Sequence, residues 1–225
     1  MVDFLCGPNW FYGIDIIIEV ISLIVAGLIA FFSYKAFKIT KERKYFFFAL
    51  AFFLIAISFV SKMYGLIIAC TGLAKASFGY FTAVTQKMTL IQFIYSMGYF
   101  LQRFIFLVGL LALTSLCLKI RNRKTIFMLV FFVFIATWFS NQSYLIFHII
   151  AAFLLIYISL YFYVNYLRKR TFNARLVPMS FFLLLISQLI FIFVIRDLNL
   201  YVVGNIFQLA GFVVLLFTYI LVLKK

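Results

Sequence analysis

The feature of this sequence that most limits its possible folds is a series of long apolar stretches separated by short polar links. A helix needs about 20 mostly apolar residues to cross about 30 Å of hydrocarbon. Seven stretches approach or exceed that length, roughly 14–34, 45–67, 90–118, 125–140, 144–167, 177–195 and 200–223. The runs are continuous rather than alternating, which excludes membrane β-barrel strands. We therefore predict an all-α bundle of seven transmembrane helices, of which the fourth is the shortest.

The composition excludes a water-soluble fold of the same length. Of the 225 residues, 68% are hydrophobic and 11% are charged, whereas soluble domains have roughly 45–50% apolar and about 25% charged residues. A soluble domain of this size still exposes a large area to water, so it could not cover this much apolar surface. We expect one transmembrane domain over residues 1–225, with the lipid bilayer as its main surrounding.

The basic residues predict which way the helices cross the membrane. Lys and Arg are retained on the cytoplasmic side during insertion. Fifteen of them fall in alternate links and at the C-terminus: Lys35, Lys38, Lys41, Arg43, Lys44, Lys119, Arg121, Arg123, Lys124, Arg168, Lys169, Arg170, Arg175, Lys224 and Lys225. Only Lys75, Lys87 and Arg196 fall on the opposite side. We expect a multi-pass protein of the cell membrane with an extracytoplasmic N-terminus and a cytoplasmic C-terminus.

The net charge of +15 follows largely from this topology signal. Anionic headgroups of the inner leaflet would attract the same residues. The basic runs are short links rather than a folded basic face, which argues against nucleic acid as a partner. The first ten residues contain no Lys or Arg, so they do not resemble a cleavable signal peptide.

Two of the three cysteines fall on the predicted outer side. Cys6 precedes the first helix and Cys70 follows the second, and the exterior is the oxidising face of the membrane. A disulfide between them is one interpretation, and two unrelated free thiols are the other. We expect Cys117, near the inner end of the third helix, to be a packing residue.

The sequence contains signs of an internal repeat. Tyr95, Gly98 and Gln102 in the third helix have the same spacing as Tyr201, Gly204 and Gln208 in the seventh. The second and sixth helices share the pattern Phe-Phe-Leu-x-x-Ile-Ser, beginning at residues 52 and 181. These matches predict a 3+1+3 order, with repeat one over about 11–118, a linker helix over about 125–140 and repeat two over about 144–223. The alternative is chance similarity between apolar segments.

This 3+1+3 order with its N-terminus outside resembles two families, the microbial rhodopsins and the SWEET and PQ-loop carriers of small solutes. The resemblance is one of architecture and extends over the whole chain. Arg103-Phe104 is similar to a rhodopsin motif of the third helix, but Phe106 stands where that motif has an acid. No Lys occurs between Lys169 and Lys224, so the seventh helix cannot form a retinal Schiff base. The Pro-Gln pair of the carriers is missing from the first and fifth helices.

Polar side chains within the spans indicate where a binding site would lie. An ionisable group in the bilayer core costs about 2.5–3.5 kcal/mol, so it usually faces the bundle interior. Arg103 lies sixteen residues before Lys119, about 24 Å along a helix, and the other candidates lie at similar depth. We predict a polar pocket in the outer half of the bundle, framed by Glu19, Lys62, Arg103, His148, Gln188, Asn205 and Gln208.

Two interpretations of these residues remain open. In the first, Glu19 pairs with Arg103 or Lys62, and the remaining cation binds an anionic or carbonyl-bearing ligand. Arg suits such a role because its guanidinium binds carboxylate or phosphate bidentately. In the second, the polar contacts only hold the bundle together, at about 0.6 kcal/mol each.

The sequence gives no sign of catalysis. It lacks the G-x-S-x-G and H-E-x-x-H motifs. With one histidine and no acidic cluster, neither a bis-histidine haem nor a zinc site can be assembled. We therefore expect a non-enzymatic receptor, sensor or binding scaffold without a cofactor, which would signal through a membrane or cytoplasmic protein partner. A small-solute carrier and a structural subunit of a membrane complex are the alternatives.

Overall fold

The computed structural model describes residue 11 and residues 13–76, 84–120, 122–140, 144–170 and 172–223. Side chains are described in these segments except at 66–76, 84–95, 140, 144, 169, 172–173 and 222–223. The described residues form seven α-helices: α1 (Ile14–Thr40), α2 (Arg43–Ala76), α3 (Val84–Cys117), α4 (Arg123–Ser140), α5 (Tyr144–Lys169), α6 (Phe172–Phe193) and α7 (Asn199–Leu223). The predicted all-α fold of seven helices is confirmed.

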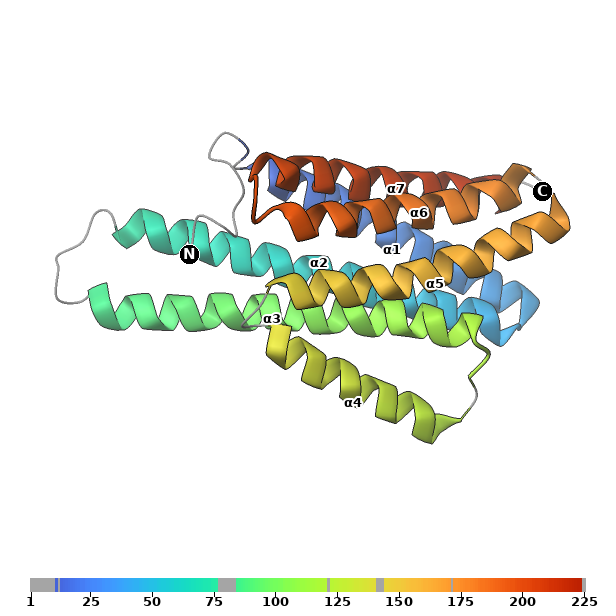
Figure 1. Ribbon diagram of the computed structural model, residues 1–225, viewed down its shortest axis with the longest axis horizontal. Coiled ribbons are helices and arrows are strands. Elements are labelled where there is room, and N and C mark those ends of the chain that lie inside the picture. Colours follow the sequence, from blue (N-terminus) through green and yellow to red (C-terminus); the bar gives the residue numbers. More distant parts are fainter. Residues whose placement is uncertain are drawn as a thin grey trace.

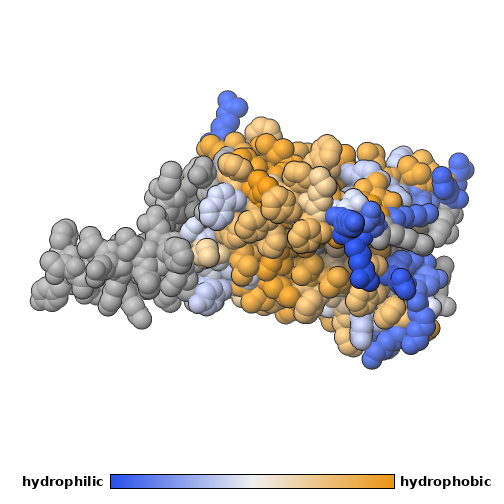
Figure 2. Space-filling view, turned by 90° about the horizontal axis from the view of Figure 1, so that it is seen from below, coloured by the Kyte–Doolittle hydropathy of each residue, from blue (hydrophilic) through white to orange (hydrophobic). Residues whose placement is uncertain are grey.

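Six of the helices are long and apolar enough to cross a membrane, which is typical of a multi-pass membrane protein. These spans are Ile14–Thr40, Arg43–Gly65, Ser96–Cys117, Leu145–Arg168, Ala174–Phe193 and Asn199–Leu221. Large apolar side chains such as Phe127 and Phe153 are 76% and 73% exposed. Figure 2 shows apolar residues over the middle of the face in view, with most of the hydrophilic residues gathered at one end. Such a surface favours a lipid surrounding, because exposing it to water would be costly.

The fourth predicted span, α4, is the shortest of the seven helices and is not among these six. α4 has 18 residues, which rise about 27 Å at 1.5 Å per residue. Figure 1 shows α3 and α5 running in the same direction, so α4 carries the chain back along the bundle. That course agrees with a seventh crossing, which stays a prediction, as does the orientation of the two ends relative to the cell.

Six helices close into a ring. α1 packs on α2 and α7, α3 packs on α2 and α5, and α6 packs on α5 and α7. α4 contacts α3 and α5 from outside this ring (Figure 1). The largest fully buried side chains include Phe52, Phe59, Leu107, Phe181 and Phe212, which fill the space between the helices. The ring leaves room for a site only where polar residues interrupt this apolar packing.

Two glycines let neighbouring helices approach closely. A Cβ at Gly109 of α3 would lie 2.8 Å from Ile55 Cγ1 and 3.0 Å from the Ala51 carbonyl oxygen, both on α2. A Cβ at Gly211 of α7 would lie 2.8 Å from Leu184 Cγ on α6. Small residues at helix interfaces have this role in membranes, where packing rather than water drives association. The α2–α3 and α6–α7 pairs are therefore fixed in register by steric contact.

Three helices end at basic residues in the left-handed conformation. Lys41 after α1, Lys119 after α3 and Arg170 after α5 have φ values of 57°, 56° and 49°. The amide nitrogens of Lys41 and Arg170 each donate to the carbonyl oxygen four residues earlier, at 2.8 Å. Left-handed residues commonly end helices in this way, because the turn satisfies terminal carbonyl groups. The basic links therefore also contain the residues at which these three helices end.

Candidate functional site

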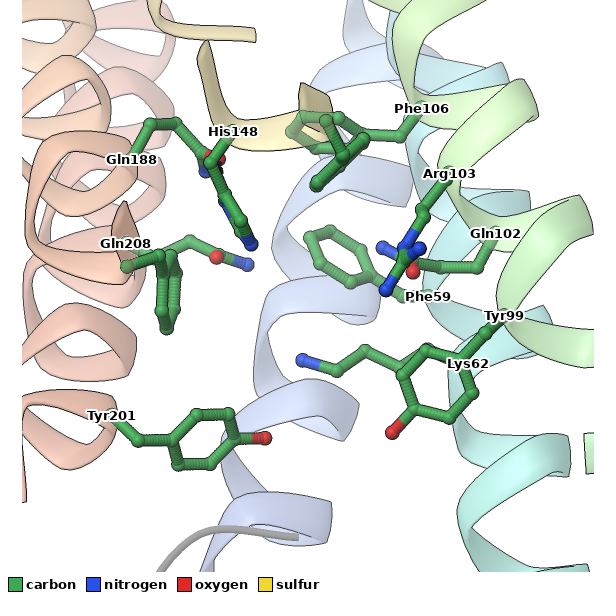
Figure 3. Close-up of a pocket in the computed structure, with 12 residues that line it drawn as sticks. Phe59, Lys62, Tyr99, Gln102, Arg103, Phe106, His148, Gln188, Tyr201 and Gln208 are labelled. Carbon is green, nitrogen blue, oxygen red and sulfur yellow. Dashed lines mark hydrogen bonds between the residues drawn. The ribbon is translucent and has the colours of Figure 1, made fainter. Parts of the chain in front are cut away.

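A polar cavity lies inside the ring, in the half nearer the α6–α7 link. Figure 3 shows the side chains that line it. Its volume open to the centre of a water molecule is about 50 Å³. Because one water needs about 10–15 Å³ on this measure, the cavity has room for a few waters or a ligand of similar size. The side chains that line it are Phe59, Lys62, Tyr99, Gln102, Arg103, Phe106, Phe147, His148, Gln188, Phe191, Tyr201 and Gln208.

Helical spacing brings these residues to a common face on each element. Side chains three, four and seven positions apart lie on one side of a helix. On α3, Tyr99, Gln102, Arg103 and Phe106 follow this spacing. The lining residues of α2, α6 and α7 are separated by three or seven positions in the same way. α2, α3, α6 and α7 therefore each present one stripe of polar and aromatic side chains to the cavity.

A buried ion pair joins α1 to α2 beside the cavity. Lys62 Nζ donates a hydrogen bond to Glu19 Oε1, and the two residues are 9% and 1% exposed. Lys62 lines the cavity, while Glu19 is not among the lining residues. The sequence left Lys62 and Arg103 as partners for Glu19, and the structure shows a pair with Lys62. Lys62 Nζ also lies 5.8 Å from the centre of the Tyr201 ring.

Asp15 is a buried acid that the predicted pocket did not include. It lies one turn before Glu19 on the same face of α1 and is 3% exposed. Its Oδ1 accepts a hydrogen bond of 2.8 Å from the Ile16 amide. The sequence indicated Asp15 through its four-residue spacing from Glu19, because residues four positions apart lie on the same face of a helix.

A second polar pair joins α5 to α6. His148 Nδ1 lies 2.8 Å from Gln188 Oε1, so the ring carries its proton on Nδ1 when that amide oxygen accepts. The rings of Phe147 and Phe191 flank the imidazole, with centroids at 4.8 Å and 5.1 Å. Both predicted residues line the cavity, and the aromatic rings beside them keep their surroundings largely apolar.

Arg103 completes the set of charged side chains at the cavity. It is 6% exposed, and its guanidinium carbon lies 5.9 Å from the centre of the Phe147 ring. Figure 3 shows that Arg103 and Lys62 from one side, and His148 and Gln208 from the other, point toward the same central space. The structure therefore brings these four residues together at one cavity.

Tyr201 contributes a hydroxyl group that the sequence analysis assigned only to the repeat. Its side chain points toward the same space (Figure 3). The Tyr201 Oη atom is buried and has no hydrogen-bond partner among the described residues. A buried hydroxyl without a partner costs about 1–3 kcal/mol. Tyr99, Tyr201 and Phe147 were missed as lining residues because aromatic side chains are too frequent in this chain to stand out.

The other predicted residues that the structure describes lie either at the cavity or at contacts within and between helices. Asn205 is buried but is not among the lining residues, and its Nδ2 donates to the Tyr201 carbonyl oxygen at 3.0 Å. In the repeat motif, Gln102 and Gln208 both line the cavity. A Cβ at Gly98 would lie 3.3 Å from Gly65 Cα, and one at Gly204 would lie 2.8 Å from the Phe191 ring.

Some sequence-based predictions fall outside the described part of the chain. Cys6 and the side chains of Cys70 and Tyr95 are not described, so the predicted disulfide lies outside the described residues. Cys117 is buried, as a packing residue would be. Among the described residues, no three His, Cys, Asp or Glu side chains gather closely enough to hold a metal ion.

No family model, curated protein or solved structure matches the chain.

Proposed function

We propose that this chain is a receptor, sensor or binding scaffold of the cell membrane that holds a small ligand in the polar cavity. The observation that carries the proposal is the cavity itself, where charged and polar side chains from five helices converge. Each charged side chain placed in the bilayer core costs about 2.5–3.5 kcal/mol. An interhelical polar contact recovers only about 0.6 kcal/mol on average. The free energy gained from polar contacts between helices is therefore smaller than the cost of burying Lys62 and Arg103 inside the ring.

The proposed role is binding rather than catalysis. The described lining residues supply hydrogen-bond donors, and none of them is a carboxylate, cysteine or serine. A bound ligand would be recognised by convergent polar groups in a largely apolar surrounding, as is usual for small-molecule sites. With the extracytoplasmic N-terminus expected from the basic residues, the cavity lies in the outer half of the bundle. A signal would reach the cytoplasm through the basic links, which a partner protein can contact.

The test of this proposal is whether a small solute can reach the cavity. The variant Gln208→Cys, in a chain with Cys6, Cys70 and Cys117 replaced by Ser, places one thiol on the lining. We expect a small methanethiosulfonate reagent to label it in membranes. The matched control is Leu215→Cys, seven residues further along α7 in the apolar core, where the side chain is 2% exposed. Labelling equal to that of the control would contradict the proposal.

The second candidate function is a small-solute carrier, which the matched halves of the ring favour. Carriers built from repeats place their substrate site between the two halves. Here α1–α2, α2–α3 and α3–α5 have contacts matched by α5–α6, α6–α7 and α7–α1. α4 would be the linker between the halves.

Several residue pairs support the repeat at a constant separation of 129 positions. Lys41 and Arg170, the left-handed ends of α1 and α5, are one such pair (170 minus 41). Glu19 and His148, which each form a polar pair with the next helix, are another. A third pair consists of the carbonyl groups of Ala51 and Ser180, which face Gly109 and Gly211. Gly109 and Gly211 are 102 positions apart, whereas the Tyr-Gly-Gln motifs of α3 and α7 are 106 positions apart. The two alignments of α3 with α7 therefore differ by four residues, about one helical turn.

The carrier function is tested by flux. Proteoliposomes containing the full chain would accumulate a labelled small solute faster than empty liposomes, and Arg103→Gln would remove the difference. Binding without flux would leave the receptor or scaffold function.

A further inference from the structure

We infer that a groove between α1 and α2 binds an anionic phospholipid, with one acyl chain in the groove and the phosphate at the basic link that joins the two helices. The inference goes beyond the proposed function, because the groove shares no lining residue with the polar cavity. Its basis is the shape of the groove, its length and the charge at one of its ends.

The groove is apolar and opens on the outside of the ring. Its volume open to the centre of a water molecule is about 580 Å³. The buried residues Ala30, Ala49 and Ala56 lie along it, while Phe31 and Phe53 beside them are 62% and 55% exposed. The other lining residues are Leu23, Gly27, Tyr34, Phe46, Leu50, Ile57 and Val60. Small residues between large exposed ones leave a channel that faces the surroundings of the bundle.

The length of the groove corresponds to one leaflet of a bilayer. Its lining residues on α1 extend from Leu23 to Tyr34, which is about 17 Å along a helix. Half of a hydrocarbon core about 30 Å thick is about 15 Å. Tyr34 and Phe46 are the lining residues nearest the α1–α2 link. The groove therefore extends from the level of this link to near the middle of the core, as an acyl chain does.

Two basic residues continue the groove beyond Tyr34 and Phe46. Lys38 follows Tyr34 by four positions, and its Nζ lies 5.3 Å from the centre of the Tyr34 ring. Arg43 begins α2, three positions before Phe46. Residues three or four positions apart lie on one face of a helix, so these exposed cations extend the two faces that line the groove. Arg binds phosphate bidentately and Lys binds it as a point charge.

The α1–α2 link carries little negative charge that would compete with a phosphate. Residues 35–44 contain five basic residues and one acid. The acid is Glu42, which forms an ion pair with Lys44 and so leaves the remainder of the link basic. Each Lys or Arg near an anionic membrane surface strengthens binding about fivefold. The link therefore favours a lipid with a net negative headgroup over a zwitterionic one.

The second half of the ring lacks this combination of residues. At the separation of 129 positions, four residues of the site have unlike counterparts: Gly27 and Ile156, Ala56 and Leu185, Lys38 and Leu167, and Arg43 and Phe172. Larger side chains replace the small ones, and apolar side chains replace the two cations. The α5–α6 pair is therefore an internal control for the α1–α2 site.

A second copy of this chain suits the groove less well. In a dimer with a two-fold axis along the membrane normal, the same surface of each copy faces the other. The basic α1–α2 links would then meet at the same end of the interface, and like charges repel. A phospholipid instead has an apolar chain for the groove and an anionic phosphate for the link.

The experiment measures the lipid composition beside the groove in nanodiscs. In the full chain with Trp10 and Trp138 replaced by Phe, Phe53→Trp places a fluorescent reporter on the groove. Phe182→Trp is the matched control, because residue 182 is 54% exposed and lies 129 positions further along the chain. Phosphatidylglycerol brominated on its acyl chains is mixed into phosphatidylcholine. We expect half-maximal quenching of Phe53→Trp at a mole fraction roughly tenfold lower than for Phe182→Trp.

Variants separate the effect of charge from that of shape. Lys38→Gln combined with Arg43→Gln should raise the mole fraction for Phe53→Trp to that of the control reporter. Arg123→Gln combined with Lys124→Gln, the same change in another basic link, should leave it unchanged. Gly27→Leu should also raise it, because the added side chain occupies the groove. No atom lies within 4 Å of a Cβ at Gly27, so this variant should fold.

Two results would overturn the inference. One is quenching of Phe53→Trp and Phe182→Trp at the same mole fraction, which would mean that lipids are not selected at the groove. The other is quenching of Phe182→Trp but not Phe53→Trp in a bilayer made wholly of brominated phosphatidylcholine. The groove would then be covered by protein, with a second copy as its occupant. Neither result bears on the labelling of Gln208→Cys, which reports on the separate cavity.

Discussion

Lys62 of α2 donates a hydrogen bond to the carboxylate of Glu19 on α1, inside the ring of six helices. The second carboxylate oxygen of Glu19 has no hydrogen-bond partner among the described residues. Removing one member of a buried pair leaves the other as an uncompensated charge, which is more costly than losing the attraction between them. The pair therefore orients the lysine at the cavity and makes each residue dependent on the other.

Single substitutions of this pair should cost more than the double substitution. We expect Glu19→Gln or Lys62→Met to lower the free energy of unfolding by about 3–5 kcal/mol each, because one buried charge remains. The double variant should lose less than the sum of the two. Unfolding in mixed detergent, followed by intrinsic fluorescence, gives the three values. Strictly additive losses would mean that the two side chains do not interact in the folded protein.

The close contacts of two glycines predict a difference between similar substitutions. Gly109→Ala and Gly211→Ala should each destabilise the protein by about 1–3 kcal/mol, because the added methyl group overlaps the facing helix. Gly27→Ala on α1 is the control, since no atom lies within 4 Å of the added Cβ, and it should have little effect. Thermal unfolding midpoints in one detergent compare all three. Equal effects at the three positions would contradict the observed α2–α3 and α6–α7 packing.

The direction of the chain after α4 predicts the accessibility of two asparagines. With seven crossings, Asn122 before α4 lies in the cytoplasm and Asn199 at the start of α7 lies outside. In a chain without native cysteines, Asn199→Cys should react with a membrane-impermeant maleimide in intact cells, and Asn122→Cys should react only after lysis. If neither reacts before lysis, α4 does not cross the membrane and the second half is inverted.

α4 also offers a fluorescent reporter of its surroundings. Trp138 is 63% exposed, and its ring packs on Phe100 of α3 at a centroid distance of 6.1 Å. In a Trp10→Phe variant in lipid nanodiscs, lipids brominated on their acyl chains should quench the emission of Trp138. Unchanged emission would place the outer face of α4 against protein or water instead of lipid.

The helices were predictable because their apolar runs are longer than any soluble core requires. The helix ends were less predictable. α2 extends beyond residue 67 to Ala76, and α3 begins at Val84 rather than near residue 90. Residues such as Lys75 and Lys87 end an apolar run without ending a helix, because helical hydrogen bonding does not depend on hydropathy.

The candidate site was partly predictable for a similar reason. Depth along each span placed Glu19, Lys62 and Arg103 at one level, but depth does not fix the rotation of a helix about its axis. The sequence therefore could not choose between Lys62 and Arg103 as the partner of Glu19. Nor could it tell that Asn205 would bond to its own helix while Gln208 lines the cavity.

The central claim, a polar cavity inside the helix ring that a small solute can reach, is tested most directly by thiol labelling in membranes. A small methanethiosulfonate reagent should label Gln208→Cys at the cavity lining and leave Leu215→Cys in the apolar core unlabelled. Equal labelling at the two positions would contradict the claim.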